Sequence, residues 1–284
     1  MQTVKSLLAP SPQTTSVRNT ALARTSLPPL QLVSAYRHHI AMIEQLIREK
    51  SGARPLRILE AGCGAKWPHK LEGTKYRLTA VDIDEEALEV RKTKVRDVDE
   101  VLVGDLRTSN LFPSCSFDVV YNSYVLEHVD GAERVLDNFI NWLAPGGLLI
   151  LKIPDRASVY GYLARLTPLW VHVFVYRYIF GSPRKPGHGP FPTYYDPVVS
   201  RTGIHSYCVQ HGCRIKYEAG HTDYFPRGRL SGVVARAVAR SIAALSFGRL
   251  DWRYNNLTLV IENAGSDDRR RAESLTSRDG RSGR

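Results

Sequence analysis

The chain has 284 residues, of which 43% are hydrophobic and 24% are charged, and its formal net charge is +11. This composition is ordinary for a folded protein of one large domain or two small ones. The four cysteines (Cys63, Cys115, Cys208 and Cys213) are too few and too irregularly spaced for a CxxC metal or redox pair. The longest apolar run, residues 169–180, is too short for a membrane-spanning helix, which needs roughly 20 residues.

The charge is unevenly distributed along the chain. Residues 55–151 carry 11 lysine and arginine and 16 aspartate and glutamate residues, whereas residues 152–250 carry 14 and 4. Such a basic half attracts anions such as phosphate, nucleic acid or a lipid headgroup, but a solvated helix face gives the same pattern. Because the first 30 residues lack the apolar segment of a signal peptide, we expect a cytoplasmic location with reduced thiols.

The first half of the chain alternates strand and helix patterns. Residues 1–28 are rich in Ser, Thr and Pro and are expected to be disordered, and residues 30–50 have apolar positions at helical spacing. We expect strands at 56–60, 77–81, 101–104, 117–121 and 148–153, with helices over 85–94 and 132–143. Strands separated by helices at this spacing predict a doubly wound, mostly parallel α/β sheet with a ligand at the carboxyl ends of its strands.

The rhythm changes after residue 154. Residues 155–200 are aromatic, proline-rich and basic, and a long ordered insertion of this kind is often a lid or binding loop. Two final strands are expected at 214–217 and 257–261, which brings the sheet to seven. An amphipathic helix is expected at 230–245, and the charged tail 266–284 is expected to be disordered.

Glycines and carboxylates follow the first three strands. Glu60 and the glycines of Gly62-Cys63-Gly64 come directly after the first strand, where a tight turn lets the backbone approach a ligand closely. Asp82 ends the second strand about 20 residues later, a position from which a carboxylate binds both ribose hydroxyls of a nucleoside. Asp105 ends the third strand, where a carboxylate can accept a hydrogen bond from an adenine amino group.

Two further motifs complete the series: the strand Phe117–Asn122 and the turn Leu143–Gly147 into the fifth strand. With these five ordered motifs the sequence resembles the class I S-adenosylmethionine-dependent methyltransferases, especially the UbiG/UbiE-like group of small-molecule enzymes. The resemblance is close over residues 56–153 and looser over 154–262. It implies a Rossmann-like methyltransferase domain over residues 29–262, with a cofactor half (55–153) and a substrate or lid half (154–256).

The resemblance also implies a site for S-adenosylmethionine. Its members come from the ends of the strands: Glu60, Gly62, Cys63, Gly64, Asp82, Ile83, Asp105, Leu106 and Asn122. In the family the glycine turn holds the methionine part of the cofactor, Asp82 would bind ribose and Ile83 would pack on adenine. Asp105 and the backbone of Leu106 would contact the adenine amine. The sequence departs from the family in having Trp67 where a third glycine or a small residue is usual, which leaves the geometry of the turn open.

Residues for the reaction itself are less well marked. A general base needs a pKa near the working pH, and His128 is the candidate beside the strand that ends at Asn122. The motif at 185–195 resembles a stretch found after the fifth strand in this group, and we expect His188, Tyr194 and Tyr195 to contact the acceptor. Glu127 and His128 alone offer too few ligands for a metal, so no metal is predicted.

The apolar stripe of the helix at 230–245 has two interpretations. Such a stripe more often packs on a sheet or lid, whereas basic amphipathic helices can also lie on anionic membranes. If the second holds, the aromatic run at 169–180 is the natural second contact, and the acceptor could be a lipid or a prenylated molecule.

The sequence thus predicts methyl transfer from S-adenosylmethionine to a small-molecule or lipid-linked acceptor. A nucleic-acid methyltransferase is the main alternative, but the Asn/Asp-Pro-Pro-Tyr signature of enzymes that act on a flipped base is missing after the fourth strand. A nicotinamide-dependent oxidoreductase would need a third glycine at the helix start. A non-catalytic scaffold is the remaining alternative, against which the intact glycines and carboxylates argue.

Overall fold

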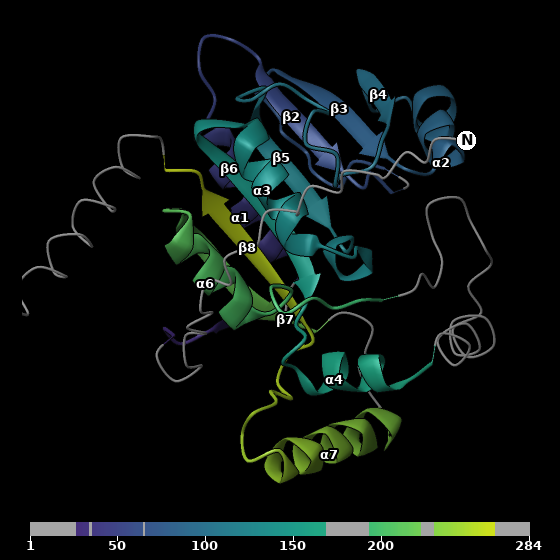
Figure 1. Ribbon diagram of the computed structural model, residues 1–284, viewed down its shortest axis with the longest axis vertical. Helices are drawn as coiled ribbons and strands as arrows, with labels where there is room; N and C mark the ends of the chain where they lie inside the picture. The colour runs from purple at the N-terminus through teal and green to yellow at the C-terminus, as the bar shows by residue number, and fades with distance from the viewer. Residues whose placement is uncertain (1–26, 34–35, 65, 169–192, 223–229, 265–284) are drawn as a thin grey trace, which may run out of the picture.

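A single sheet of eight strands runs through the computed structural model, which describes residues 27–33, 36–64, 66–168, 193–222 and 230–264 (Figure 1). The strands are β1 (Gln31–Val33), β2 (Leu56–Ala61), β3 (Tyr76–Asp82), β4 (Glu100–Val103), β5 (Phe117–Ser123), β6 (Leu143–Pro154), β7 (Arg214–His221) and β8 (Asn256–Glu262). Their order is β1-β7-β8-β6-β5-β2-β3-β4. All neighbours are parallel except β8, which pairs antiparallel with β6 and with β7.

The order in which the strands are added reverses between β2 and β5, which are themselves parallel. From β2 the chain proceeds through β3 to β4 on one side, and from β5 through β6 on the other. Such a switch point opens a crevice at the carboxyl ends of the strands. Both central strands are buried on both faces, so they read as nearly continuous apolar runs rather than as alternating ones.

Helices cover both faces of the sheet. The helices of the described residues are α1 (Tyr36–Arg48), α2 (Glu85–Val90), η2 (Arg91–Val95, a π-helix), η3 (Leu126–His128, a 3₁₀ turn), α3 (Ala132–Trp142), α4 (Val159–Leu166), α6 (Arg201–Gln210) and α7 (Leu230–Leu245), of which α4 and α7 lie apart from the sheet. Ile43 and Ile47 of α1 pack on one face of the sheet, whereas Phe139 of α3 and Ile204 of α6 pack on the other. Figure 1 shows α1 behind the sheet and α3 and α6 in front of it.

The predicted fold class is confirmed, and several boundaries change. The structure adds β1 to the seven predicted strands, so the helix expected from residue 30 begins only at Tyr36. The helix predicted over 85–94 ends as an α-helix at Val90 and continues as the π-helix η2 to Val95, where the left-handed Arg96 (φ 56°) ends it. The strand predicted at 148–153 starts earlier, since Leu143 already pairs with Phe117.

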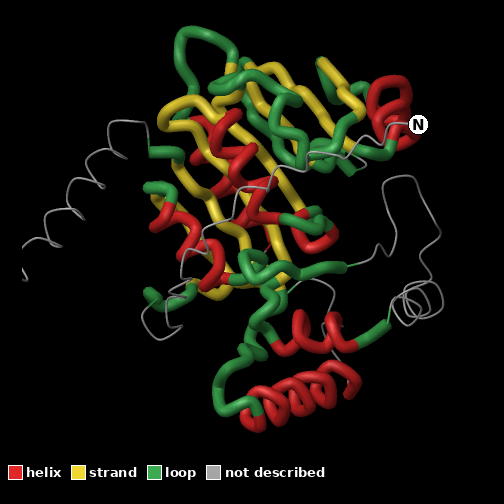
Figure 2. Tube along the Cα trace, in the orientation of Figure 1, coloured by secondary structure: helices red, strands yellow, loops and turns green. Residues whose placement is uncertain are grey.

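Helices α4 and α7 form a separate unit beyond the carboxyl ends of the parallel strands (Figure 2). They contact each other through Val159, Ala239 and Ala243. The preferred interpretation of α7, an apolar stripe packed on the sheet or lid, is wrong for most of the described side chains, although Ile242 packs against the contact with α4. The small alanines provide the contact, and Val234, Val238 and Leu245 are exposed.

Three sequence predictions fall outside the described residues. They are the disordered segments 1–28, apart from its last two residues, and 266–284, and the central part of the expected lid, residues 169–192. The described ends of the insertion form α4 and the turn before α6. Among the described helices, none has the length and apolarity that a bilayer crossing requires.

Candidate functional site

The turn after β2 depends on its two glycines. Gly62 and Gly64 have φ values of 76° and 54°, in the left-handed region that other residues rarely adopt. A Cβ on Gly62 would also collide with the side chain of Val125, so a larger residue cannot stand there. A Cβ on Gly64 would have no described atom within 4 Å. The backbone at Gly64 therefore borders open space, as a close approach to a ligand requires.

Asp82 at the end of β3 lies beside this turn. Parallel pairing of Ala61 with Val81 brings the two strand ends together. One carboxylate oxygen of Asp82 accepts from the Cys63 amide at 3.0 Å, and the other accepts from the Asp84 amide at 3.0 Å. Asp84 in turn caps α2 by accepting from the Ala87 amide at 3.1 Å, as expected of an aspartate at a helix N-terminus.

The residues predicted to surround adenine lie at the ends of β3 and β4. The side chain of Ile83 is 75% exposed although it is large and apolar, so it is open to packing by a flat ring. Leu106 is buried in the main core, which leaves its backbone as the part that can face a ligand. The side chain of Asp105 is 41% exposed.

Asp105 already has a cationic partner, Arg107. Its carboxylate accepts from the Arg107 amide at 2.9 Å and from the guanidinium at 2.6–3.0 Å. These hydrogen bonds lower the pKa of Asp105, so the group is a carboxylate and can only accept. An exposed ion pair contributes little to stability. An adenine amine can therefore replace Arg107 as the donor to one carboxylate oxygen of Asp105.

Glu60 lies behind the turn and pairs with a buried arginine. Its carboxylate accepts from Arg91 at 2.8 Å, and both side chains are almost fully buried. Burial raises the pKa of Glu60 to about 7, although Arg91 opposes the shift. Arg91 also donates to the Cys63 carbonyl and to Asp97, and Asp97 accepts from the Trp67 amide at 2.7 Å. This network supports the turn from inside, and binding of the cofactor by Glu60 itself stays a prediction.

Trp67 packs against the core. Its ring meets Tyr121 edge-on with centroids 5.4 Å apart and His69 at 5.1 Å. Trp67, which stands where a third glycine is usual, therefore fills space beside the sheet. The open side of the turn remains at Gly64.

Asn122 at the end of β5 is fully buried. Its amide donates to the Ala61 carbonyl at 2.8 Å and so joins β5 to the end of β2. Its carbonyl oxygen has no hydrogen-bond partner among the described residues. Buried polar atoms are normally paired, so this oxygen is a candidate contact for a bound molecule.

The segment after β5 carries Glu127 and His128. The Glu127 side chain is buried, and one of its oxygens has no described partner. His128 is partly exposed, with its Nε2 atom 3.8 Å from the other Glu127 oxygen. Within the described residues no three potential metal ligands cluster together.

The predicted acceptor residues separate in the structure. The amides of Tyr194 and Tyr195 both donate to the Glu127 carbonyl, at 2.8 and 3.3 Å, so the turn before α6 adjoins His128. The ring of Tyr194 is exposed. The prediction that both tyrosines contact the acceptor needs correction, because the ring of Tyr195 belongs to the main hydrophobic core. His188 lies outside the described residues.

The buried Glu127 carboxyl should make stability depend on pH. Burial raises its pKa to about 8, so the folded protein holds a proton that the unfolded chain releases above its ordinary pKa. This contribution to stability is present at low pH and is lost as pH rises toward about 8. We expect Glu127→Gln to match the wild type near about pH 5 and to exceed it by a few kcal/mol near about pH 9.

Urea unfolding at both pH values checks this prediction. Glu133→Gln, which changes an exposed carboxylate in the next helix, is the matched control and should leave the pH profile unchanged. Equal pH profiles for Glu127→Gln and the wild type would mean that Glu127 is hydrated in the folded protein.

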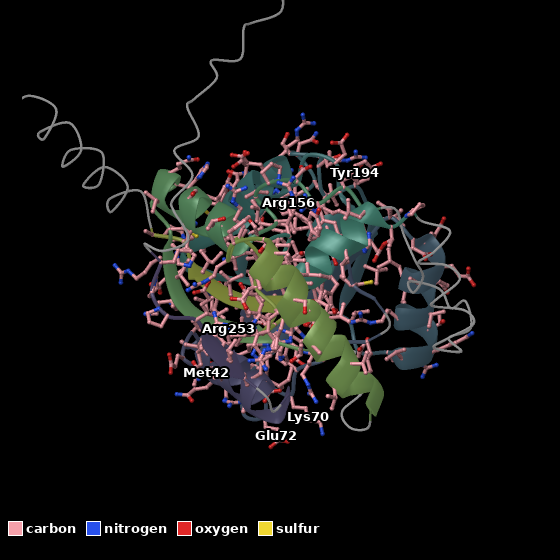
Figure 3. All side chains as sticks on the ribbon, turned by 90° about the horizontal axis from the view of Figure 1, so that it is seen from below. Met42, Lys70, Glu72, Arg156, Tyr194 and Arg253 are labelled. Atoms are coloured by element: carbon pink, nitrogen blue, oxygen red, sulfur yellow. The ribbon has the colours of Figure 1, made fainter. Side chains whose placement is uncertain are left out.

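A cavity of about 460 Å³ lies near the carboxyl end of β6. Arg156, Arg165, Asp196 and Tyr207 are among its lining residues. Burial and the neighbouring Arg165 lower the pKa of Arg156, and the Nε atom of Arg156 has no partner in the described structure. Figure 3, which views the molecule from below, labels Arg156 and Tyr194 on the same side of the view.

Sequence reasoning missed several residues of the site. Arg91, Asp97 and Arg107 are charged residues in charged surroundings, and no spacing marks them as different from surface residues. Lys152 is buried at the end of β6 with its ammonium 5.5 Å from the centre of the Tyr124 ring. Lys152 could have been noticed by its position, because a lysine near the end of a buried strand is unusual.

Comparisons with known proteins agree with this geometry. Residues 59–151 match the methyltransferase domain family. A probable S-adenosylmethionine-dependent methyltransferase of Mycobacterium tuberculosis is 30% identical over 140 residues, which are 49% of this chain and 50% of that protein. The ubiquinone/menaquinone biosynthesis C-methyltransferase UbiE of Shewanella sediminis is 30% identical over 115 residues, 36% of this chain and 45% of that one. The chain thus spans about half the length of the curated relatives it matches.

A solved structure supports the fold. It is a complex of the Haloferax volcanii Trm112 methyltransferase activator with a methyltransferase, and one of its chains aligns with a TM-score of 0.50 at 15% identity. The alignment covers 80% of this chain and 89% of that one. The glycine turn, the carboxylates at three strand ends and the matched segment identify residues 59–151 as a domain of the class I S-adenosylmethionine-dependent methyltransferase family, whose cofactor is S-adenosylmethionine.

Proposed function

We propose that the protein transfers the methyl group of S-adenosylmethionine to a small-molecule or lipid-linked acceptor. The observation that carries the proposal is the arrangement at the carboxyl ends of β2, β3 and β4. There Asp82 joins the open turn at Gly64, and Ile83 and Asp105 stand exposed beside it. These groups suit a sulfonium nucleoside. The carboxylates can bind its hydroxyls and its amine, and the apolar surface can pack on its base.

The reaction needs little covalent chemistry from the protein. The sulfonium supplies an electrophilic methyl group, and the new bond to the acceptor forms as the carbon–sulfur bond breaks. The chain must therefore hold the acceptor in line and accept the proton that an oxygen or carbon nucleophile loses. His128 is the proposed base, because it is partly exposed and adjoins the turn at Tyr194.

Two features support a small or lipid-linked acceptor. The cavity beside Arg156 has the size of small-molecule sites, which run from about 300 to 1,000 Å³. The similar UbiE proteins are named as C-methyltransferases of ubiquinone and menaquinone biosynthesis. Both features favour a small or lipid-linked acceptor over nucleic acid, because binding a nucleic-acid backbone would need a long basic track on the protein.

The test supplies methyl-labelled S-adenosylmethionine with separate small-molecule, lipid and RNA extracts of cells. We expect label in a product of the first two and release of S-adenosylhomocysteine. Label confined to RNA would overturn the acceptor class. Cofactor binding without turnover on any extract would favour the non-catalytic scaffold.

With an accepted substrate in hand, His128→Gln tests the base. Loss of a general base should slow a single turnover by roughly 10²–10⁴-fold while leaving cofactor binding intact. His211→Gln, which changes a partly exposed histidine at the end of α6, is the control. A normal single-turnover rate for His128→Gln would remove His128 from this role.

A further inference from the structure

The unit formed by α4 and α7 carries an unusual concentration of exposed apolar side chains. More than half of the exposed large hydrophobic residues in the described parts of the chain belong to it: Tyr162, Leu163, Leu166, Val233, Val234, Val238, Leu245 and Phe247. We refer to these residues as the α4–α7 face. A soluble surface normally scatters such residues singly, and a group of them indicates an interaction site.

The geometry of α7 explains why this face is open. Ala239 and Ala243 contact α4 and are buried. Val234, Val238 and Leu245 follow at helical spacing on another side, so they form one stripe. Leu245 is 79% exposed. The contact with α4 therefore uses Ala239 and Ala243, with Ile242 packed at its edge, and leaves Val234, Val238 and Leu245 in water.

Phe247 makes the pattern stronger. It is 93% exposed and has a φ of 53°, a conformation that favours glycine or asparagine just after a helix. The Phe247 ring is not buried there, and the left-handed backbone conformation is unfavourable for phenylalanine. A side chain that costs stability without packing is explained if it binds something outside the chain.

All the charges of this unit are positive. Residues 156–195 and 224–250 contain no aspartate or glutamate, and α4 and α7 carry Arg165, Arg236 and Arg240 as their ionisable groups apart from two tyrosines. Arg240 lies over the Trp252 ring, 4.8 Å from its centre. Arg236 and Arg240 lie on the flank of α7 nearer Tyr160 and Trp252, across the helix from the stripe. The unit as a whole thus presents apolar and positive groups, which match a surface that is apolar and negatively charged at once. A bilayer containing anionic lipids is such a surface.

The unit formed by α4 and α7 lies at the same end of the molecule as the proposed cofactor site. α4 follows β6 directly after Arg156, and in Figures 1 and 2 α7 is the outermost element beyond the carboxyl ends of the parallel strands. In Figure 3 α7 crosses this end of the molecule. A bilayer against α7 would thus face the end of the sheet that carries the cofactor residues.

We propose that the α4–α7 face docks the protein on an anionic lipid bilayer. The apolar stripe and Phe247 enter the interface, and the positive charge of Arg165, Arg236 and Arg240 attracts the unit to anionic headgroups. This inference deepens the proposed function, because it names the bilayer as the place from which a lipid-linked acceptor is reached. Docking itself requires neither cofactor nor turnover.

Sedimentation with vesicles tests the docking. The full chain is mixed with vesicles of phosphatidylglycerol in phosphatidylcholine, and with phosphatidylcholine alone. We expect binding to the first that exceeds binding to the second by roughly tenfold or more. Phe247→Asn together with Leu245→Gln should lower binding roughly tenfold or more, and Arg236→Gln with Arg240→Gln should lower it by a similar factor.

Matched variants separate docking from folding and from catalysis. Asparagine suits the left-handed position of Phe247, so that variant should keep its unfolding free energy. Val209→Asn, which removes a 72% exposed apolar side chain from α6, should bind vesicles like the wild type. Intact cofactor binding in the docking variants shows that their loss is independent of methyl transfer.

Three results would overturn the proposal. They are no sedimentation with anionic vesicles, equal binding to neutral vesicles, and unchanged binding by the α7 variants. A dimer that is detected by light scattering and abolished by Phe247→Asn, without vesicle binding, would assign the face to a second copy of the chain instead.

Discussion

Arg91→Ala should lower the free energy of unfolding by about 3–5 kcal/mol and weaken the binding of S-adenosylmethionine. The Arg91 guanidinium is fully buried and holds Glu60, Asp97 and the Cys63 carbonyl. Its removal leaves the Glu60 carboxyl buried without its cation, and it releases the backbone that forms the glycine turn. Urea unfolding of the free protein and cofactor titration measure the two effects.

The loss should depend on pH in a defined direction. Burial already raises the pKa of Glu60 to about 7 in the presence of Arg91, and without the arginine that pKa rises further. A raised carboxyl pKa contributes stability that is present at low pH and is lost as pH rises. The variant should therefore be less destabilised near about pH 5 than near about pH 8.

Two further variants make the argument specific. Lys92→Ala changes an exposed residue in the same π-turn and should cost little. Glu60→Gln in the Arg91→Ala background removes the uncompensated charge and should recover part of the stability, as a double-mutant cycle would show. A loss below about 1 kcal/mol for Arg91→Ala would contradict a supporting role for this network.

Asp82→Ala should weaken S-adenosylmethionine binding by about 1–3 kcal/mol, which is roughly 5- to 150-fold in the dissociation constant. The carboxylate would lose its charged hydrogen bonds to ribose, and the Cys63 and Asp84 amides would lose the acceptor that aligns the turn. Calorimetric titration measures the change directly.

Asp84→Ala is the matched control for this experiment. Asp84 stands two residues away and caps α2, so its loss should cost roughly 0.5–2 kcal/mol of stability but should change cofactor affinity much less. An affinity of Asp82→Ala close to that of the wild type would remove Asp82 from the ribose site.

Much of the fold could be predicted from the sequence because its determinants are local. Parallel strands buried on both faces read as short apolar runs, and β2 and β5 were found for that reason. Glycine at positions 62 and 64 marks a backbone conformation that other residues disfavour. Asp84, followed by two glutamates, marks the start of α2 in the same way.

The remaining features depend on contacts between distant segments. Arg91 is buried because the π-helix η2 and the end of β2 come together in the fold. The local sequence does not reveal this contact. The apolar stripe of α7 predicts burial, but the structure uses Ala239 and Ala243 for packing, and only the three-dimensional arrangement distinguishes the two sides. Tyr194 and Tyr195 are identical in type, and the left-handed backbone at Tyr195 (φ 50°) accompanies their opposite exposure.

Isothermal titration of the purified chain with S-adenosylmethionine, S-adenosylhomocysteine and NAD tests the central claim most directly. The glycine turn and the three strand-end carboxylates predict binding of the first two in roughly the micromolar range, with no heat from NAD. Binding of NAD, or of none of the three, would contradict the assignment of this crevice to the methyl-donor cofactor.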